Sequence, residues 1–189
     1  MSLTYGVLTE EAFRDLLDAR GILRPGTLAA PDPRRAYVIF SQSRAVRLDI
    51  EATRRHAEQF FATKIGLTVD KRYEDVAPEV DAARLVVSSG DGRASGTRLC
   101  YGRAVLPSDV IAAEEAERAI GTYGLALLAK RCPTVWTVVP ESDDDRAALT
   151  IAAILASTLL GPIVSPGGHE IIGVRSARLK LEGRASPYR

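Results

Sequence analysis

The chain has 189 residues, of which 46% are apolar and 26% are charged, and its formal net charge is +1 at pH 7. This length and composition are typical of one globular domain and exclude disordered, collagen-like and disulfide-stapled chains. Because 25 basic residues nearly balance 24 acidic ones, the overall charge does not favour nucleic acid, a membrane surface or an acidic substrate as a partner. Nucleic acid stays open as a less favoured partner.

The first 35 residues are expected to lie at the periphery of the domain. Thr9–Leu17 has the pattern of a short amphipathic helix with an acidic first turn, and Gly21 follows where that helix would end. Residues 22–35 contain three prolines, which disfavour both helix and central strand. We therefore predict a peripheral helix followed by a proline-rich connector.

The next elements are predicted to be a strand, a helix and a hairpin. Ala36–Ser41 is rich in β-branched and aromatic residues and predicts a buried strand. Asp49–Lys64 has apolar residues at helical spacing, with Gly66 as the expected left-handed cap. Leu85–Val87 and Leu99–Leu106 predict two strands, and the glycine-rich loop between them suits a long hairpin connection.

A single long helix is predicted over residues 108–131. Ser108 is a suitable N-cap, and Glu114 with Arg118 forms an expected i,i+4 ion pair. Gly121 and Gly124 weaken this helix, so we expect them to allow close packing.

Three elements are predicted in the last third of the chain. Thr134–Val139 predicts a strand, and Asp143–Asp145 supplies an acidic start for a helix over Ala147–Leu160, which Gly161-Pro162 ends. The apolar part of that helix is too short to span a membrane, so no membrane segment is expected. Ile171–Leu181 alternates imperfectly between apolar and polar residues and predicts a final strand.

Taken in order, these elements predict one α+β domain over residues 1–189. Its expected architecture is a mixed, largely antiparallel sheet of about five strands, layered with about three to four helices. Two cysteines and the lack of a signal-peptide pattern at the start favour a cytoplasmic protein.

The two histidines are the first candidates for chemistry. His169 lies in a glycine turn next to Glu170, where an imidazole and a carboxylate can reach a ligand or a divalent metal. One histidine and one glutamate do not complete a metal site, and the alternative is a turn residue bonded to its own loop. His56 follows two arginines on a predicted helix, and we expect it to be solvated or hydrogen-bonded.

The glycine-rich loop Ser88–Arg98 is a candidate anion site. Its glycines let backbone N–H groups approach an anion, and Arg93 and Arg98 supply charge. The loop lacks the Gly-Lys-Ser/Thr ending of a P-loop, so the alternative is an ordinary hairpin connection.

Cys100 lies in a predicted strand and is the candidate nucleophile. A nucleophilic thiol needs a base, and His169 is the imidazole that folding could bring near. The alternative is a buried structural cysteine.

Four segments carry a resemblance to a known family: Leu99–Arg103, Val110–Glu114, Ile151–Ile163 and His169–Val174. They are similar to parts of the histidine-utilisation antiterminator family. The resemblance implies that His169, with Glu170, helps to hold a divalent metal that binds an amino acid, and that the activated protein binds RNA. The other metal-binding histidines of that family have no counterpart here, and Ala147–Leu160 is predicted as helix where the family has a strand.

The sequence leaves three functions open. The first is a regulatory, metal-assisted binding protein in which Arg93, Arg98 and His169 contact a small molecule, and which assembles as a homo-oligomer. The second is a small enzyme that acts on an anionic substrate through His169, Glu170 and Cys100. The third is a structural or interaction module that packs against its own kind.

Overall fold

The computed structural model describes residues 19, 31–44, 47–73, 80–90 and 94–183, with side chains left out over 67–73 and 80–84. The predicted helix at Thr9–Leu17, most of the connector and Arg93 lie outside the described residues. The described part contains seven strands in one sheet and five α-helices, which confirms an α+β domain with more strands than predicted.

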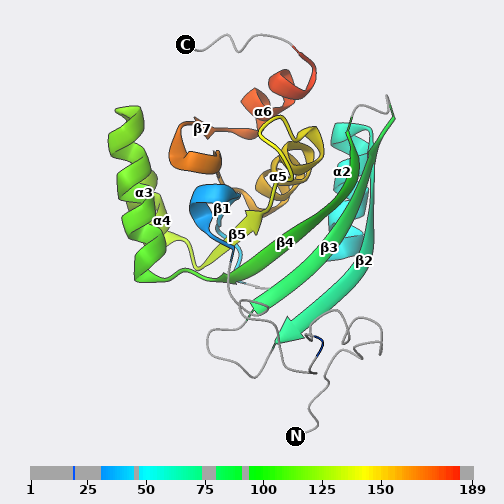
Figure 1. The fold of residues 1–189 in the computed structure, drawn as a ribbon, viewed down its shortest axis with the longest axis horizontal. Coiled ribbons are helices and arrows are strands. Elements are labelled where there is room, and N and C mark those ends of the chain that lie inside the picture. The colour runs from blue at the N-terminus through cyan, green and yellow to red at the C-terminus, as the bar shows by residue number, and fades with distance from the viewer. Residues whose placement is uncertain (1–18, 20–30, 45–46, 74–79, 91–93, 184–189) are drawn as a thin grey trace, which may run out of the picture.

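All neighbouring strands of the sheet are antiparallel, in the order β2-β3-β4-β5-β1-β6-β7. Their bounds are β1 Tyr37–Ser41, β2 Thr63–Tyr73, β3 Val80–Ser89, β4 Ser95–Ala104, β5 Thr134–Val138, β6 Ile163–Val164 and β7 Ile171–Ile172. The long strands β2, β3 and β4 curve along one side of the molecule (Figure 1). The predicted β3–β4 hairpin is confirmed, whereas β2 and β6 were not predicted.

Helices cover both faces of the central strands (Figure 1). Their bounds are α2 Ile50–Phe61, α3 Pro107–Ile120, α4 Leu125–Arg131, α5 Arg146–Leu159 and α6 Val174–Leu181, with 3-10 turns η1 at Pro33–Arg35 and η2 at Pro166–Gly168. No helix within the described ranges has the length and apolar character needed to cross a bilayer.

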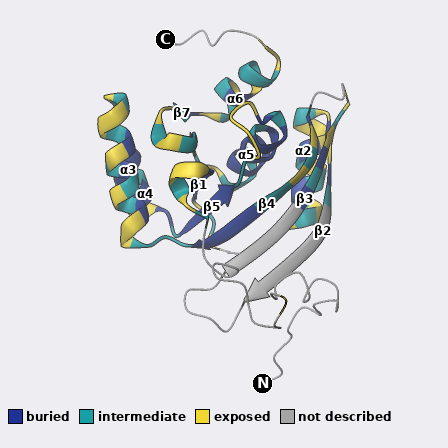
Figure 2. Cartoon of the chain, viewed as in Figure 1, coloured by how far each residue is buried: buried dark blue, intermediate teal, exposed yellow. Residues whose placement is uncertain are grey.

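Strand β1 is buried on both faces because it contributes side chains to two separate cores. Tyr37 and Ile39 join a cluster with α2, α5 and α6, while Val38 and Phe40 join a cluster with α3 and α4. Successive side chains of a strand point to opposite faces, which produces this division. Figure 2 shows α5 and the central strands as the most buried part of the molecule.

Carboxylates start two of the predicted helices. Asp49 accepts a hydrogen bond from the backbone N–H of Ala52 at 2.9 Å and begins α2. Asp145 accepts one from Ala148 at 2.9 Å and begins α5. The predicted end of α2 is wrong, because Ala62 takes the left-handed conformation, with φ of 48°, and Gly66 lies within β2.

The long helix predicted over residues 108–131 is two helices. The chain turns between α3 and α4 at Gly121 and Gly124, whose φ angles are 72° and 109°. These φ angles favour glycine, so the two residues interrupt the helix that was predicted to be continuous. Glu114 pairs with Lys130 across the two helices at 3.2 Å, in place of the predicted pair with Arg118.

The predicted strand over Ile171–Leu181 is wrong beyond its first two residues. After β7, Gly173 begins helix α6. Val174, Ala177 and Leu181 then pack against the α5 side of the core, with Ala177 fully buried. Their i, i+3 and i+7 spacing is that of a helix face, which outweighs the imperfect alternation of the segment.

Gly161 brings the end of α5 against β1. Leu160 takes the left-handed conformation that ends α5, as the Gly161-Pro162 stop predicts. A Cβ added at Gly161 would lie 1.8 Å from the carbonyl oxygen of Phe40. Only glycine fits this close approach of two backbones.

Candidate functional site

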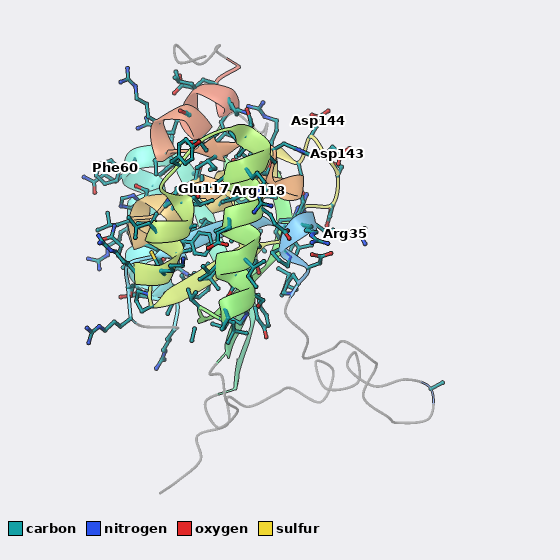
Figure 3. The ribbon with its side chains drawn as sticks, turned by 90° about the vertical axis from the view of Figure 1, so that its left-hand side faces the viewer. Arg35, Phe60, Glu117, Arg118, Asp143 and Asp144 are labelled. Carbon is teal, nitrogen blue, oxygen red and sulfur yellow. The ribbon has the colours of Figure 1, made fainter. Side chains whose placement is uncertain are left out.

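A polar cleft of about 910 Å³ lies where the β6–β7 turn meets the start of β1 and the loop after β5. His169 and Glu170, both singled out from the sequence, line this cleft. Arg35 of η1 and Asp143 of the loop line it as well, and Figure 3 shows them on the same edge of the molecule. The structure therefore brings the predicted His-Glu pair together with charged residues from distant parts of the chain.

Glycines and local hydrogen bonds shape the turn that carries His169. Gly167 and Gly168 have φ angles of 77° and 68°. The backbone N–H of Glu170 donates to Ser165 Oγ at 2.9 Å, and the N–H of Ser165 donates to the Glu170 carbonyl at 2.9 Å. His169 is exposed, and its imidazole lies against Gly167. The glycine turn therefore holds His169 and Glu170 at the cleft.

Glu170 is engaged in an ion pair with Lys180 of α6. Both residues line the polar cleft. Any cation that approached Glu170 would compete with the Lys180 ammonium group for the same carboxylate.

Tyr37 is a cleft residue that the sequence analysis did not single out. It is 8% exposed at the start of β1 and lines the polar cleft. Burial raises the pKa of the Tyr37 phenol, and the negative charges of Asp145, Glu170 and Asp144 raise it further. The phenol therefore stays neutral and able to donate a hydrogen bond. The sequence signal that could have identified Tyr37 is its phenol hydroxyl at the first position of a buried strand.

The polar cleft carries charges of both signs. Its charged lining residues are Asp32, Arg34, Arg35, Glu141, Asp143, Glu170 and Lys180. Arg34 pairs with Glu115 at 3.3 Å, and Asp32 accepts from the backbone N–H of Arg34 at 2.9 Å. Within the described parts of the chain, the side chains of Asp32, Arg35 and Asp143 form no ion pair. One guanidinium and two carboxylates are thus left for a ligand with charges of both signs.

An apolar pocket of about 200 Å³, which we name the α3 pocket, adjoins the polar cleft. It lies between α3 and the β1–β6 strands. The apolar side chains that line it are Pro33, Val38, Phe40, Ala112, Ala113, Ala116, Ala119 and Val164. The helix contributes only alanines to this apolar lining, and their short side chains leave the space open. Arg34 and Gly167 line both the α3 pocket and the polar cleft.

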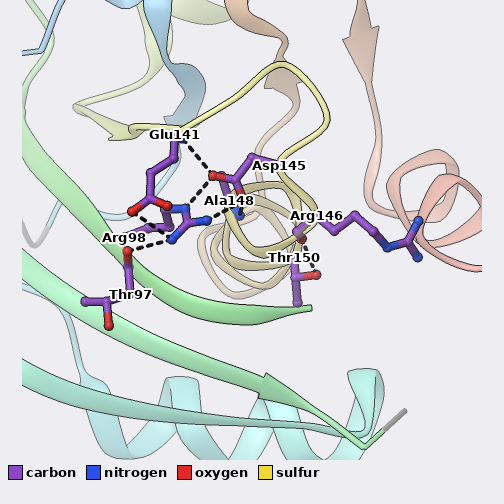
Figure 4. Close-up of polar contacts among 7 residues, drawn as sticks. All are labelled: Thr97, Arg98, Glu141, Asp145, Arg146, Ala148 and Thr150. Atoms are coloured by element: carbon purple, nitrogen blue, oxygen red, sulfur yellow. Dashed lines mark hydrogen bonds and ion pairs between the residues drawn. The ribbon is translucent and has the colours of Figure 1, made fainter. Parts of the chain in front are cut away.

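Arg98, a predicted ligand contact, lies in a network at the start of α5 (Figure 4). Its Nη2 donates to Asp145 Oδ1 at 3.0 Å, its Nε donates to Asp145 Oδ2, and its Nη1 lies 3.2 Å from Glu141 Oε1. The hydrogen bond to Asp145 raises the pKa of Arg98. Arg98 lines neither the polar cleft nor the α3 pocket. Its guanidinium holds the N-cap of a helix.

Asp145 is almost completely buried, with a side chain 2% exposed. Burial acts to raise the pKa of this carboxyl. Hydrogen bonds from Arg98 and from the backbone N–H groups of Glu141 and Ala148, together with the Arg98 charge, outweigh burial, so the pKa is lowered. The network therefore keeps Asp145 ionised.

The structure does not bring Cys100 to the cleft. Cys100 is 0% exposed within the α5 side of the core, opposite Val138 of β5, and does not line the cleft. Cys132 is buried on the α3 side, and burial raises the pKa of its thiol. Neither environment favours a reactive thiolate.

The structure bears on two further predictions, the hydrogen bonding of His56 and the metal site at His169. His56 Nε2 lies 2.7 Å from Ser157 Oγ, so this imidazole is hydrogen-bonded as expected. In the described part of the chain, no group of three or more His, Cys, Asp and Glu side chains is arranged to hold a metal ion. The described residues around His169 therefore do not by themselves fit a metal centre.

The arrangement can hold a molecule that has both a charged head and an apolar body. The polar cleft offers charges of both signs, a neutral phenol and an imidazole, and the α3 pocket offers apolar walls. Binding sites in proteins commonly combine such apolar walls with a few polar groups that fix orientation. The chain matches no protein-family model, no curated protein and no solved structure.

Proposed function

We propose that the protein binds a small zwitterion with an apolar side chain, of the amino-acid type. The observation that carries this proposal is that the two cavities adjoin, since Arg34 and Gly167 line both of them. A ligand that crosses this boundary would leave its charged head in the polar cleft and place its apolar body in the α3 pocket.

The charges of the cleft support a zwitterion over a simple anion. The guanidinium of Arg35 suits a carboxylate, because its planar donors match the two oxygens. The carboxylate of Asp143 suits an ammonium group. The Tyr37 phenol and the His169 imidazole add further hydrogen-bonding groups to the same cleft.

The volume of the α3 pocket supports a modest apolar side chain. A pocket of about 200 Å³ bounded by Phe40, Val164 and the alanines of α3 suits a branched aliphatic group. Burying a side chain of that size contributes about 1.5 to 3 kcal/mol.

A metal-assisted form of this proposal follows from the resemblance of His169–Val174 to the antiterminator family. In that form, His169 and Glu170 share a divalent ion with the ligand, which supplies the remaining donors. The ion would have to displace Lys180 from Glu170. Addition of Mg²⁺ or Mn²⁺ should then strengthen ligand binding.

Isothermal titration calorimetry tests the proposal with three probes, each with and without Mg²⁺ or Mn²⁺. L-Leucine has both the head and the body, glycine lacks the body, and 4-methylpentanoate lacks only the ammonium group. We expect binding in the order leucine, 4-methylpentanoate, glycine. Each loss should be about tenfold or more, because one charge-assisted hydrogen bond or one buried side chain is worth at least that factor.

Two variants and a control locate the site. Ala113→Leu fills the α3 pocket and should abolish the advantage of leucine over glycine. Arg35→Gln removes the guanidinium that would hold the carboxylate and should weaken every probe that carries one. Arg131→Gln, on exposed α4 and outside both cavities, should change nothing. Leucine binding that survives Ala113→Leu undiminished would refute the placement.

A further inference from the structure

A further cavity, of about 530 Å³, lies between the end of α2, the β3–β4 turn and the facing parts of α5 and α6. We name it the Phe60 cavity after one of its walls. It shares no described lining residue with the polar cleft or the α3 pocket. Figure 3 shows Phe60 and Arg35 at opposite edges of the molecule, so the two regions are separate.

Two arginines give the Phe60 cavity positive charge. Arg146 Nη2 donates to the backbone oxygen of Leu181, whereas Arg146 Nε is buried and has no hydrogen-bond partner within the described ranges. Arg178 adds a second guanidinium on α6, and Glu182 is the single carboxylate among the described lining residues.

Aromatic rings form the other wall of the Phe60 cavity. Phe60 is 46% exposed although it is a large apolar residue. Its ring centroid lies 4.6 Å from that of His56, which fixes one face of the ring. The guanidinium of Arg178 lies 5.6 Å from the centroid of Phe61, within the range of a cation–π contact. Charge and aromatic surface therefore meet in one cavity.

We propose that the Phe60 cavity binds an aromatic monocarboxylate. The carboxylate would accept hydrogen bonds from the Arg178 guanidinium, beside the positive charge of Arg146, and the ring would pack against Phe60. Guanidinium groups suit carboxylates because their donors match the two oxygens. The single Glu182 carboxylate leaves positive charge in excess, which favours one negative charge on the ligand. This site is independent of the zwitterion site proposed above.

A titration of the full chain with benzoate tests the proposal, monitored by amide chemical shifts at pH 7 and constant ionic strength. Benzamide has nearly the same shape without the charge, and acetate has the charge without the ring. We expect benzoate to bind at least about tenfold more tightly than either analogue, since each analogue lacks one of the two contacts. Arg178→Gln should weaken benzoate binding by a similar factor.

Two controls keep the test decisive. Arg175→Gln removes an exposed arginine from the same helix that does not line the cavity, and should change benzoate affinity less than about twofold. Ala113→Leu, which fills the separate α3 pocket, should leave benzoate binding unchanged. Absence of benzoate binding, equal binding of benzamide, or equal loss in the Arg175 and Arg178 variants would overturn the proposal. Loss of benzoate binding in Ala113→Leu would place benzoate in the α3 pocket and also overturn it.

Discussion

The two faces of the central sheet are packed in opposite ways. On one face, α5 is almost entirely buried, and Ile151, Ile154 and Leu155 are 0% exposed. On the other face, Ile111 of α3 and Leu127 of α4 are each 56% exposed, and the α3 pocket stays open beneath α3. The α5 face is a closed core, and the α3 face keeps room for another molecule.

Strand β4 is connected to one helix on each face of the sheet by an arginine–aspartate ion pair. Arg98 pairs with Asp145, which caps α5, and Arg103 pairs with Asp109 in the first turn of α3. The two arginines are an odd number of residues apart, so their side chains leave opposite faces of the strand. The helices are therefore anchored alike, and the difference between the faces comes from the side chains between helix and sheet.

Substitution of either arginine should remove the ion pair that connects β4 to one helix. We expect this to cause the largest loss of stability among the variants. In Arg103→Met, the one hydrogen bond that Asp109 keeps from the described residues is that from the backbone N–H of Leu106, at 2.7 Å. We expect a loss of about 3 to 5 kcal/mol in the free energy of unfolding, as for a buried pair that loses one partner. Arg98→Met should cost about 2 kcal/mol, because Asp145 keeps two backbone donors. Urea unfolding of both variants measures the difference.

The prediction is tested most directly by which of the two arginine variants loses more free energy of unfolding. A larger loss for Arg98→Met than for Arg103→Met would show that backbone donors do not compensate Asp145. Arg131→Met, a change of the same kind at an exposed position on α4, serves as the control and should stay within about 0.5 kcal/mol.

Enlarging one alanine on each face should sharpen the contrast in packing. Ala152 of α5 is 0% exposed in the closed core, so Ala152→Leu should destabilise the protein by about 1 to 3 kcal/mol. Ala113 of α3 is 2% exposed and lines the α3 pocket. Ala113→Leu should therefore be neutral, or stabilise by about 0.5 to 2 kcal/mol through filling the cavity. Thermal and urea unfolding compare them, and equal losses would mean that the α3 pocket is not open.

The smallest expected effect concerns acid stability on the α5 face. Burial acts to raise the pKa of Asp145 in the folded state. Its hydrogen bonds from Arg98 and two backbone N–H groups outweigh burial, so the pKa is lowered. A lowered folded-state pKa contributes stability above the unfolded value, about 3.9, that is lost as the pH falls through the folded value. Asp145→Asn keeps a capping side chain but removes this contribution. Its stability should therefore fall less steeply than that of the unchanged protein below about pH 4.

Asp49→Asn provides the comparison for the acid experiment. Asp49 also caps a helix, α2, but it is exposed and accepts from a backbone N–H without a buried arginine. Urea unfolding from pH 6 to pH 2.5 should separate Asp145→Asn from the unchanged protein. The same change in both variants would mean that the acid dependence comes from capping alone.

Local patterns predicted the elements whose stabilising contacts are close in sequence. Ala36–Ser41 and Thr134–Val139 proved to be β1 and β5, and Asp145 proved to be the cap of α5. Strand β2 was missed although Ile65, Leu67 and Val69 alternate with other residues, because the helix pattern before it was extended too far. The signal for β2 was therefore present in the sequence.

The candidate site could be predicted only in part. His169 and Glu170 were singled out because a glycine turn is visible in the sequence, and both line the polar cleft. Arg98 was singled out for its charge, but its partner Asp145 is remote in sequence and buried. Tyr37 was missed because its exposure to a cleft depends on how the β6–β7 turn lies against β1.

The sequence by itself determined the α+β class, the buried strand β1 and the acidic start of α5, since these depend on side chains within a few residues. The predicted caps at Gly66 and Ser108 are wrong, because α2 ends at Ala62 and Leu106 is the N-cap of α3. Only the tertiary structure decided that β4 lies between β3 and β5, that Arg98 pairs with Asp145, and that Arg34 lines both the polar cleft and the α3 pocket. These outcomes depend on contacts between segments far apart in the chain, whose free energies outweigh weak local preferences.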